Sequence, residues 1–276
     1  MITDYRVAII QMASGSNVSA NLHEAGRLIG EAANMGASLV VLPENFALMP
    51  MHSIDNVNIR ENTDTGQIQD FLSQQAARLG IWLVGGTLPM VADDPLKFRA
   101  ACLVFDNTGK RIARYDKMHL FDVTAAPNEQ YCESKTIEAG HQVVVIDTPY
   151  GRLGLAVCYD LRFPELFRCM FAQGVELICV PCAFTAVTGK AHWEVLVRAR
   201  AVENLCYVIA ANQGGYHVNG RETYGDSMII DSWGIVLTRL NRGAGVICAD
   251  IDLEKQADLR RKFPVYQHRR FQCQLL

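Results

Sequence analysis

Short runs of apolar residues recur along the chain, and their lengths suit the strands of a sheet. Several runs are apolar almost throughout instead of alternating with polar residues, which is typical of strands covered on both faces. Polar segments separate the runs, as turns and loops would. The pattern therefore predicts strands within residues 6–12, 38–44, 81–87, 99–106, 143–148, 151–160, 176–184, 206–213 and 227–234.

Segments with a helical spacing of apolar residues lie between some of these strands. They cover residues 19–36, 67–80 and 189–205. In the first segment, apolar residues three or four positions apart share one face of the predicted helix: Leu22, Ala25, Leu28, Ile29 and Ala32. The early alternation of strand and helix favours an α/β fold, and the strand-rich middle favours paired sheets. Periodicity alone leaves a doubly wound sheet open.

Composition and charge narrow the class of protein. Half of the 276 residues are hydrophobic, a fifth are charged, and the formal net charge is -3. This balance indicates neither a nucleic-acid partner nor an anionic membrane. The sequence starts without the basic region of a signal peptide, and no stretch approaches ~18 apolar residues. We expect a soluble, cytoplasmic protein in which residues 1–276 form one domain, with a C-terminal tail from about residue 255.

Nine cysteines are spread through apolar stretches, without the paired CxxC spacing of a zinc site. The lone CxxC from Cys179 to Cys182 leaves open a redox or metal protein, which would hold zinc or a disulfide between these two residues. Their apolar surroundings instead favour buried thiols that pack as small apolar side chains. This usage suits a reducing cytoplasm, and we expect neither a metal nor a cofactor.

Two charged residues are the first candidates for a site. Glu44 stands where a strand is predicted to end, and strand ends gather ligands in open α/β folds, whereas Lys117 lies inside a short charged patch that is followed by Leu120 and Phe121. Glu44, in "LVVLPENF", is either a solvated carboxylate or a general base whose pKa is raised by apolar surroundings. Lys117, in "RYDKMHLFD", is either a surface lysine or, if buried near a carboxylate, a positive charge able to stabilise an oxyanion. His119, two residues further on, is the residue that a cysteine-histidine enzyme would require.

A cysteine is the third candidate. Cys158, in "LAVCYDLRFPEL", ends an apolar run and precedes a predicted turn and helix. A thiol at such a turn lies beside backbone N–H groups and the positive end of the helix, which lower its pKa and supply oxyanion donors. A core cysteine that happens to end a strand is the alternative. Glu133, in the loop-like "YCESKTIEAG", is by itself most simply a solvated carboxylate.

Three blocks together carry a resemblance: "VVLPENF", "RYDKMHLFD" and "GLAVCYDLRFPEL". In this order and at these separations they resemble the nitrilase (carbon–nitrogen hydrolase) superfamily over essentially the full chain. The resemblance places that family's Glu-Lys-Cys triad on Glu44, Lys117 and Cys158, and its additional glutamate on Glu133. It further implies a four-layer α-β-β-α sandwich, a homodimer or higher homo-oligomer whose C-terminal tails pack on the partner subunit, and a reaction without cofactor.

The resemblance also implies a mechanism. Cys158 would attack an amide carbonyl, and Glu44 would take the thiol proton and pass it to the leaving group. Lys117 and the backbone N–H of Tyr159 would stabilise the oxyanion, and water would then hydrolyse the thioester. Glu133 would orient Lys117 and help to place the substrate. His119 would be structural, because a carboxylate and an ammonium take the roles that imidazole has in other cysteine hydrolases.

Residues 181–215 and 220–234 resemble the branch that contains deaminated-glutathione amidases and ω-amidases. The leading hypothesis is hydrolysis of deaminated glutathione to 2-oxoglutarate and cysteinylglycine, a metabolite-repair reaction. The alternatives are an ω-amidase acting on 2-oxoglutaramate or 2-oxosuccinamate, another small linear amide or carbamoyl hydrolase, and a non-catalytic scaffold. A substrate with carboxylates calls for cationic and hydroxyl donors, so the predicted substrate contacts are Tyr159, Arg162, Phe184 and Thr185. An ion pair of Arg162 with Asp160 or Glu165 is the structural alternative.

Overall fold

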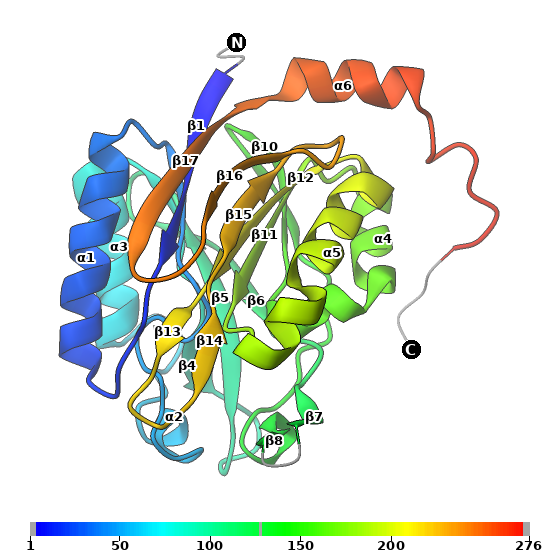
Figure 1. The fold of residues 1–276 in the computed structure, drawn as a ribbon. Helices are drawn as coiled ribbons and strands as arrows, with labels where there is room; N and C mark the ends of the chain where they lie inside the picture. Colours follow the sequence, from blue (N-terminus) through cyan, green and yellow to red (C-terminus); the bar gives the residue numbers. More distant parts are fainter. Residues whose placement is uncertain (1–3, 127–128, 273–276) are drawn as a thin grey trace.

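Two mixed β-sheets packed face to face form the centre of the computed structural model, which describes residues 4–126 and 129–272 (Figure 1). In the described residues the first sheet has seven strands, in the spatial order β17 (Gly245–Asp252), β1 (Asp4–Gln11), β2 (Leu39–Val41), β3 (Trp82–Val84), β5 (Phe98–Phe105) and β4 (Leu88–Val91), with β6 (Arg111–Asp116) also paired to β5. The second has six: β16 (Val236–Leu240), β15 (Ser227–Ile230), β12 (Tyr207–Asn212), β11 (Leu177–Cys182), β10 (Gly151–Leu155) and β9 (Val145–Thr148).

The strands at the centre of each sheet are parallel, whereas the flanking strands are antiparallel. Parallel pairs join β1 to β2 and β2 to β3, and join β10 to β11 and β11 to β12. Strands β2, β3, β11 and β12 are buried at every position, which explains why their sequences are apolar almost throughout. The flanking strand β16 alternates between less and more exposed residues instead.

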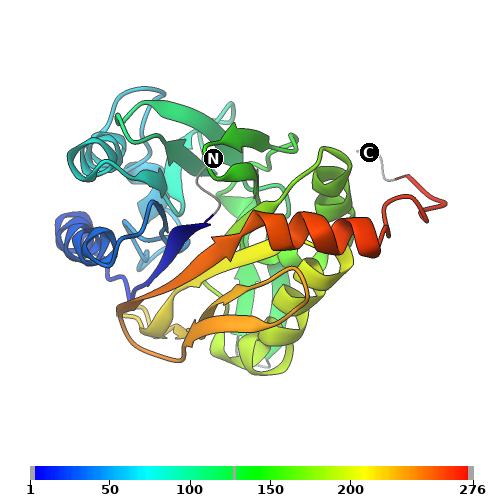
Figure 2. The same ribbon diagram turned by 90° about the horizontal axis from the view of Figure 1, so that it is seen from above.

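Helices cover the outer faces of both sheets. On one side lie α1 (Val18–Asn34) and α3 (Gln67–Leu79), and on the other lie α4 (Pro164–Ala172) and α5 (Ala186–Asn204) (Figures 1 and 2). Strand β1 shows how the layers pack, since Val7 and Ile9 enter the core between the sheets while Ala8 and Ile10 enter the core beneath α1 and α3. The predicted α-β-β-α sandwich is confirmed, and the open alternative of a doubly wound sheet is not what the chain forms.

Smaller elements complete the described chain: α2 (Asp55–Asn58), the hairpin of β7 (Asp122–Ala126) and β8 (Glu129–Cys132), the short 3₁₀ helices η1 (Glu133–Lys135) and η2 (Cys158–Arg162), the hairpin of β13 (Gly214–Tyr216) and β14 (Glu222–Tyr224), and α6 (Leu253–Lys262). The predicted tail therefore begins as a helix. Gln256 and Arg260 attach α6 to its own chain by bonds to the carbonyls of Glu176 and Leu205. The last four residues of that tail, including Cys273, lie outside the described residues.

Candidate active site

The predicted triad residues come from both sheets. Glu44 follows β2, Lys117 directly follows β6, and Cys158 follows β10 after a two-residue link. Each side chain therefore stands just past the carboxyl end of a strand. Because the two sheets pack face to face, these strand ends meet, and the structure brings the three residues together with Glu133 from η1.

Lys117 is the centre of a buried ion cluster. Its Nζ lies 2.9 Å from Glu44 Oε1 and 2.7 Å from Glu133 Oε2. Lys117 is 1% exposed and Glu44 is 4% exposed. Burial by itself lowers the pKa of Lys117, but the charges of Glu133 and Glu44 outweigh it and raise that pKa well above its ordinary value. The ammonium is therefore held charged, and the alternative of a surface lysine is wrong.

Glu133 is ordered by its neighbours and is not a freely solvated loop carboxylate. It begins η1, directly after β8. Besides its contacts with Lys117, its Oε2 accepts a hydrogen bond of 2.8 Å from the backbone N–H of Phe121. Both carboxylate oxygens thus have partners, so the position of Glu133 relative to the lysine is fixed.

Cys158 occupies a sharp turn between strand and helix. Its backbone has φ 46°, in the left-handed region that residues other than glycine rarely adopt. The side chain is 8% exposed and reaches a narrow cavity. Glu44, Glu133, Tyr159, Phe184 and Thr185 line the same cavity, which therefore combines a thiol, two carboxylates and hydroxyl groups.

Asp160 stabilises this turn from within. It is fully buried, and its Oδ2 accepts hydrogen bonds from Val157 N at 2.7 Å and from the Tyr115 hydroxyl at 2.6 Å. Its Oδ1 lies 3.1 Å from His119 N and 2.6 Å from His119 Nδ1. The His119 ring also stacks on Phe163 at a centroid separation of 3.7 Å. These contacts support a structural role for His119, and they assign Asp160 a role that the sequence pattern did not suggest.

Arg162 is a predicted substrate contact, with an ion pair to Asp160 or Glu165 as the structural alternative. Within the described residues it contacts neither Asp160 nor Glu165 as an ion pair, because Asp160 already bonds to the turn. Its guanidinium nitrogens instead lie 3.3 Å from His192 Nδ1, and the group lies over the Tyr159 and Phe184 rings. Arg162 is not among the described residues that line the cavity, so its contact with substrate stays a prediction.

Four residues that the sequence pattern did not indicate also line the cavity: Phe121, Ala183, Thr188 and Arg221. Arg221 lies in "GRETYGDSM", a stretch that the resemblance covers, but nothing in its local pattern distinguishes it from a surface arginine. Thr188 lies one helical turn from Thr185, and the two hydroxyl oxygens are 2.9 Å apart. The Thr185 hydroxyl also caps α5 by accepting from Thr188 N.

Cys179 and Cys182 lie within β11 as buried free thiols. Burial raises the pKa of each thiol well above its ordinary value. Among the residues that the structure describes, no group of three or more side chains could hold a metal ion. The lone CxxC is therefore part of a buried strand and not an exposed redox motif.

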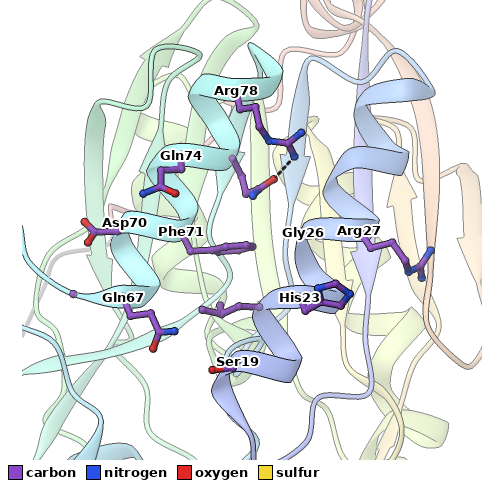
Figure 3. A pocket seen from close by; sticks show the side chains of 12 residues that line it. Ser19, His23, Gly26, Arg27, Gln67, Asp70, Phe71, Gln74 and Arg78 are labelled. Atoms are coloured by element: carbon purple, nitrogen blue, oxygen red, sulfur yellow. Dashed lines mark hydrogen bonds between the residues drawn. The ribbon is translucent and has the colours of Figure 1, made fainter.

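A wider, open groove lies away from the cavity, between α1 and α3 (Figure 3). The Phe71 ring lies between the two helices and packs close to Gly26, where a Cβ would be 3.4 Å from the ring. Arg27 is paired with Glu24 and Glu31 on its own helix, and Arg78 with Gln75. Ser19 and His23 line this groove, but within the described residues no hydrogen bond joins their side chains. The cavity at Cys158 is the better candidate for chemistry because a lysine and two glutamates are held together beside the thiol.

A mixed α-β-β-α sandwich that joins a cysteine, a lysine and two glutamates at its strand ends defines a hydrolase of the nitrilase type. The family model for carbon-nitrogen hydrolases matches residues 6–261. The chain belongs to this family, and it is an enzyme that hydrolyses carbon–nitrogen bonds.

Two curated relatives, both named deaminated glutathione amidase, are similar along nearly the whole chain. The relative from Yersinia enterocolitica is 41% identical over 272 residues, which cover 98% of this chain and 94% of the relative. The human relative is 39% identical over 268 residues, which cover 96% of this chain and 82% of the relative. Among solved structures, Saccharomyces cerevisiae Nit3, described as a member of branch 10 of the nitrilase superfamily, has a TM-score of 0.87 at 32% identity and covers 98% of this chain and 97% of its own.

Proposed function

We propose that this enzyme is an amidase that hydrolyses the amide of deaminated glutathione, giving 2-oxoglutarate and cysteinylglycine. The observation that carries the chemistry is the buried Lys117 ammonium, which is held by the buried carboxylate of Glu44 and the partly buried carboxylate of Glu133, both in one cavity with Cys158. The substrate follows from the name shared by the curated relatives, at about 40% identity along nearly the whole chain. No comparable observation favours an ω-amidase.

In the proposed first half-reaction, Cys158 Sγ attacks the amide carbonyl carbon while Glu44 takes the thiol proton. The carbonyl oxygen becomes an oxyanion, which the Lys117 ammonium and the backbone N–H of Tyr159 stabilise. As the intermediate collapses, the C–N bond breaks and Glu44 delivers the proton to the leaving amine of cysteinylglycine. The acyl group remains on Cys158 as a thioester.

In the proposed second half-reaction, Glu44 takes a proton from water, which attacks the thioester. The C–S bond breaks, 2-oxoglutarate leaves, and the proton returns to Cys158. Glu133 keeps Lys117 in place throughout, since it contacts the ammonium with both oxygens. The buried lysine stays charged in both halves because its pKa is raised. This arrangement needs no imidazole near the thiol.

Side-by-side kinetics test the proposal. We expect the wild-type protein to hydrolyse deaminated glutathione with a higher kcat/KM than 2-oxoglutaramate, and we expect Cys158→Ala to lose at least about a thousandfold in kcat. Brief exposure to substrate followed by intact-protein mass spectrometry should reveal a 2-oxoglutaryl adduct on Cys158. A preference for 2-oxoglutaramate would reject the substrate, and full activity of Cys158→Ala would reject the mechanism and favour a scaffold.

We further propose a homodimer that acts in the cytoplasm as a repair enzyme for a damaged metabolite. Apolar side chains exposed along α5, among them Val187, Val195 and Val202, support the dimer, because such residues on one helix face favour association. The segment after α6 extends away from the sheets (Figure 1), which suits a tail that crosses to the partner. The free thiols of Cys102, Cys179 and Cys182 suit a reducing compartment. None of the helices in the described ranges is long and apolar enough to span a bilayer.

A further inference from the structure

The hairpin of β13 and β14 is joined to the cavity through the start of α5. Thr223 of β14 forms an isolated antiparallel bridge with Thr185. The backbone N–H of Tyr224 donates a 2.9 Å hydrogen bond to the carbonyl of Phe184. Since Phe184 and Thr185 line the cavity, the residue that precedes β14, Arg221, is held at the same wall.

The guanidinium of Arg221 lies in this wall and has no carboxylate partner in the part of the chain that the structure describes. It lies 5.2 Å from the centroid of the Tyr131 ring, and its Nη2 donates to the carbonyl of Ala183. Its Nε is buried and has no hydrogen-bond partner within the described residues. Nearby arginines differ, since Arg242 pairs with Glu222 and Arg239 pairs with Asp226 and Glu194. A buried donor without a partner is costly unless a ligand satisfies it.

A carboxylate is the group that best complements this donor. Guanidinium and carboxylate form short, charge-assisted hydrogen bonds that are about twice as strong as neutral ones. Deaminated glutathione carries two carboxylates, one on the 2-oxo acyl part and one on the glycine of the leaving group. The dipeptide leaving group spans at most about 7 Å, and Arg221 lies in the wall of the same cavity as Cys158.

We propose that Arg221 binds the glycine carboxylate of the leaving group, an inference that rests on the proposed function. Arg221 is only partly buried, whereas Cys158 and Glu44 are buried. Arg221 therefore lies nearer to solvent, on the side from which we expect the leaving group to depart. Arg221 would thus select a peptide-like amide over a simple amide that releases ammonia.

The test uses a pair of substrates that differ only at this carboxylate: deaminated glutathione and its glycine amide, in which a neutral amide replaces the carboxylate. We expect the wild-type enzyme to prefer the acid. For Arg221→Met, kcat/KM for the acid should fall about ten- to a hundredfold, mainly through KM, and much less for the glycine amide. Arg221→Lys should recover part of the preference, because it restores the charge without the planar fork.

Arg242→Met is the matched control, since it removes another arginine beside the same hairpin, paired on the exposed surface with Glu222. It should keep the wild-type preference for the acid. Thermal melting of each variant checks folding. An equal loss on both substrates in Arg221→Met would overturn the carboxylate assignment alone. Wild-type protein that does not hydrolyse deaminated glutathione would instead reject the proposed function and this assignment with it.

Discussion

Lys117 illustrates how neighbours decide the role of a single residue. The same lysine on the surface would contribute little, because exposed ion pairs are worth at most about 1 kcal/mol. Here it is removed from water and compensated by Glu44 and Glu133 at distances below 3 Å. Removing one member of such a cluster leaves an uncompensated buried charge. The three residues therefore act as one unit, and their individual contributions do not add.

Asp160 stabilises the turn that holds Cys158, the proposed nucleophile, and Asp160→Asn tests this role. Asparagine keeps the shape of the aspartate side chain but replaces one acceptor oxygen by an NH₂ donor. In either orientation that NH₂ group faces existing donors: Val157 N and Tyr115 Oη on one side, or His119 N on the other. We expect the free energy of unfolding to fall by about 2–4 kcal/mol, and kcat to fall because the turn that holds Cys158 is displaced. Urea denaturation and steady-state kinetics measure both effects.

Tyr115→Phe is the control for this prediction. It removes one donor to Asp160 but leaves the bonds from Val157 and His119 in place. Tyr115→Phe should lower the free energy of unfolding by about 1 kcal/mol. If Asp160→Asn costs no more stability than Tyr115→Phe, the carboxylate does not stabilise the turn as we infer.

The sequence indicated Glu44 and Cys158 because each stands where an apolar run ends, and Lys117 because it lies in a charged patch followed by apolar residues. Single residues left their roles open, and only their order and separation connected them. Asp160 and Arg221 could not be predicted in the same way. The position of Arg221 depends on the pairing of Thr223 with Thr185. These two residues lie in different segments, and no local sequence pattern shows that the segments meet.

At the scale of elements, burial explains which predictions succeeded. The amphipathic helices α1, α3 and α5 and the fully buried central strands were predicted close to their observed bounds. Strands β6 and β17 were not predicted. Strand β6 contains many polar residues, whereas β17 is mostly apolar and only partly buried along most of its length. Strand β17 is stabilised by pairing along its whole length with β1, at the far end of the sequence. Such pairing is tertiary and overrides weak local preference.

Two helical glycines, Gly189 and Gly30, differ in how closely neighbouring atoms approach them, and alanine at each position tests the packing of α5. A Cβ at Gly189 of α5 would lie 2.3 Å from Tyr224 Cγ, whereas a Cβ at Gly30 of α1 would meet nothing within 4 Å. We expect Gly189→Ala to lower the free energy of unfolding by about 1–3 kcal/mol because it forces β14 away from α5. Gly30→Ala should raise it by about 0.5–1 kcal/mol, since alanine favours the helix.

Thermal or urea denaturation of both variants checks this prediction. The hairpin of β13 and β14 carries Arg221, so Gly189→Ala should also raise KM for deaminated glutathione, while Gly30→Ala should leave kinetics unchanged. Equal stability changes in the two variants would contradict the close contact between Gly189 and Tyr224.

At the scale of the whole molecule, the sandwich explains why the site has residues from both halves of the chain. Glu44 and Lys117 follow strands of the first sheet, and Cys158 follows a strand of the second. Gln213 links the halves, because its Nε2 donates to the Ser14 hydroxyl and to the carbonyl of Glu44. Neither sheet alone contains the site, so the packing of the two sheets is itself a requirement for activity.

The outer face of α5 is the proposed dimer interface, and Val195→Glu tests this assignment. Val195 is 69% exposed, and Val187 and Val202 lie eight and seven residues away, which places all three on one side of the helix. A dimer that buries this face would have to bury the new carboxylate on each subunit, and an unpaired buried charge costs several kcal/mol. We expect the wild-type protein to have twice the 30.6 kDa mass of one chain and Val195→Glu to have the mass of one chain.

Light scattering after size exclusion measures both masses. Val91→Glu is the control, because Val91 is a 42% exposed residue of β4 in the other sheet, and this variant should stay dimeric. Wild-type protein that is monomeric, or a Val195→Glu protein that stays dimeric, would place the interface elsewhere or exclude it.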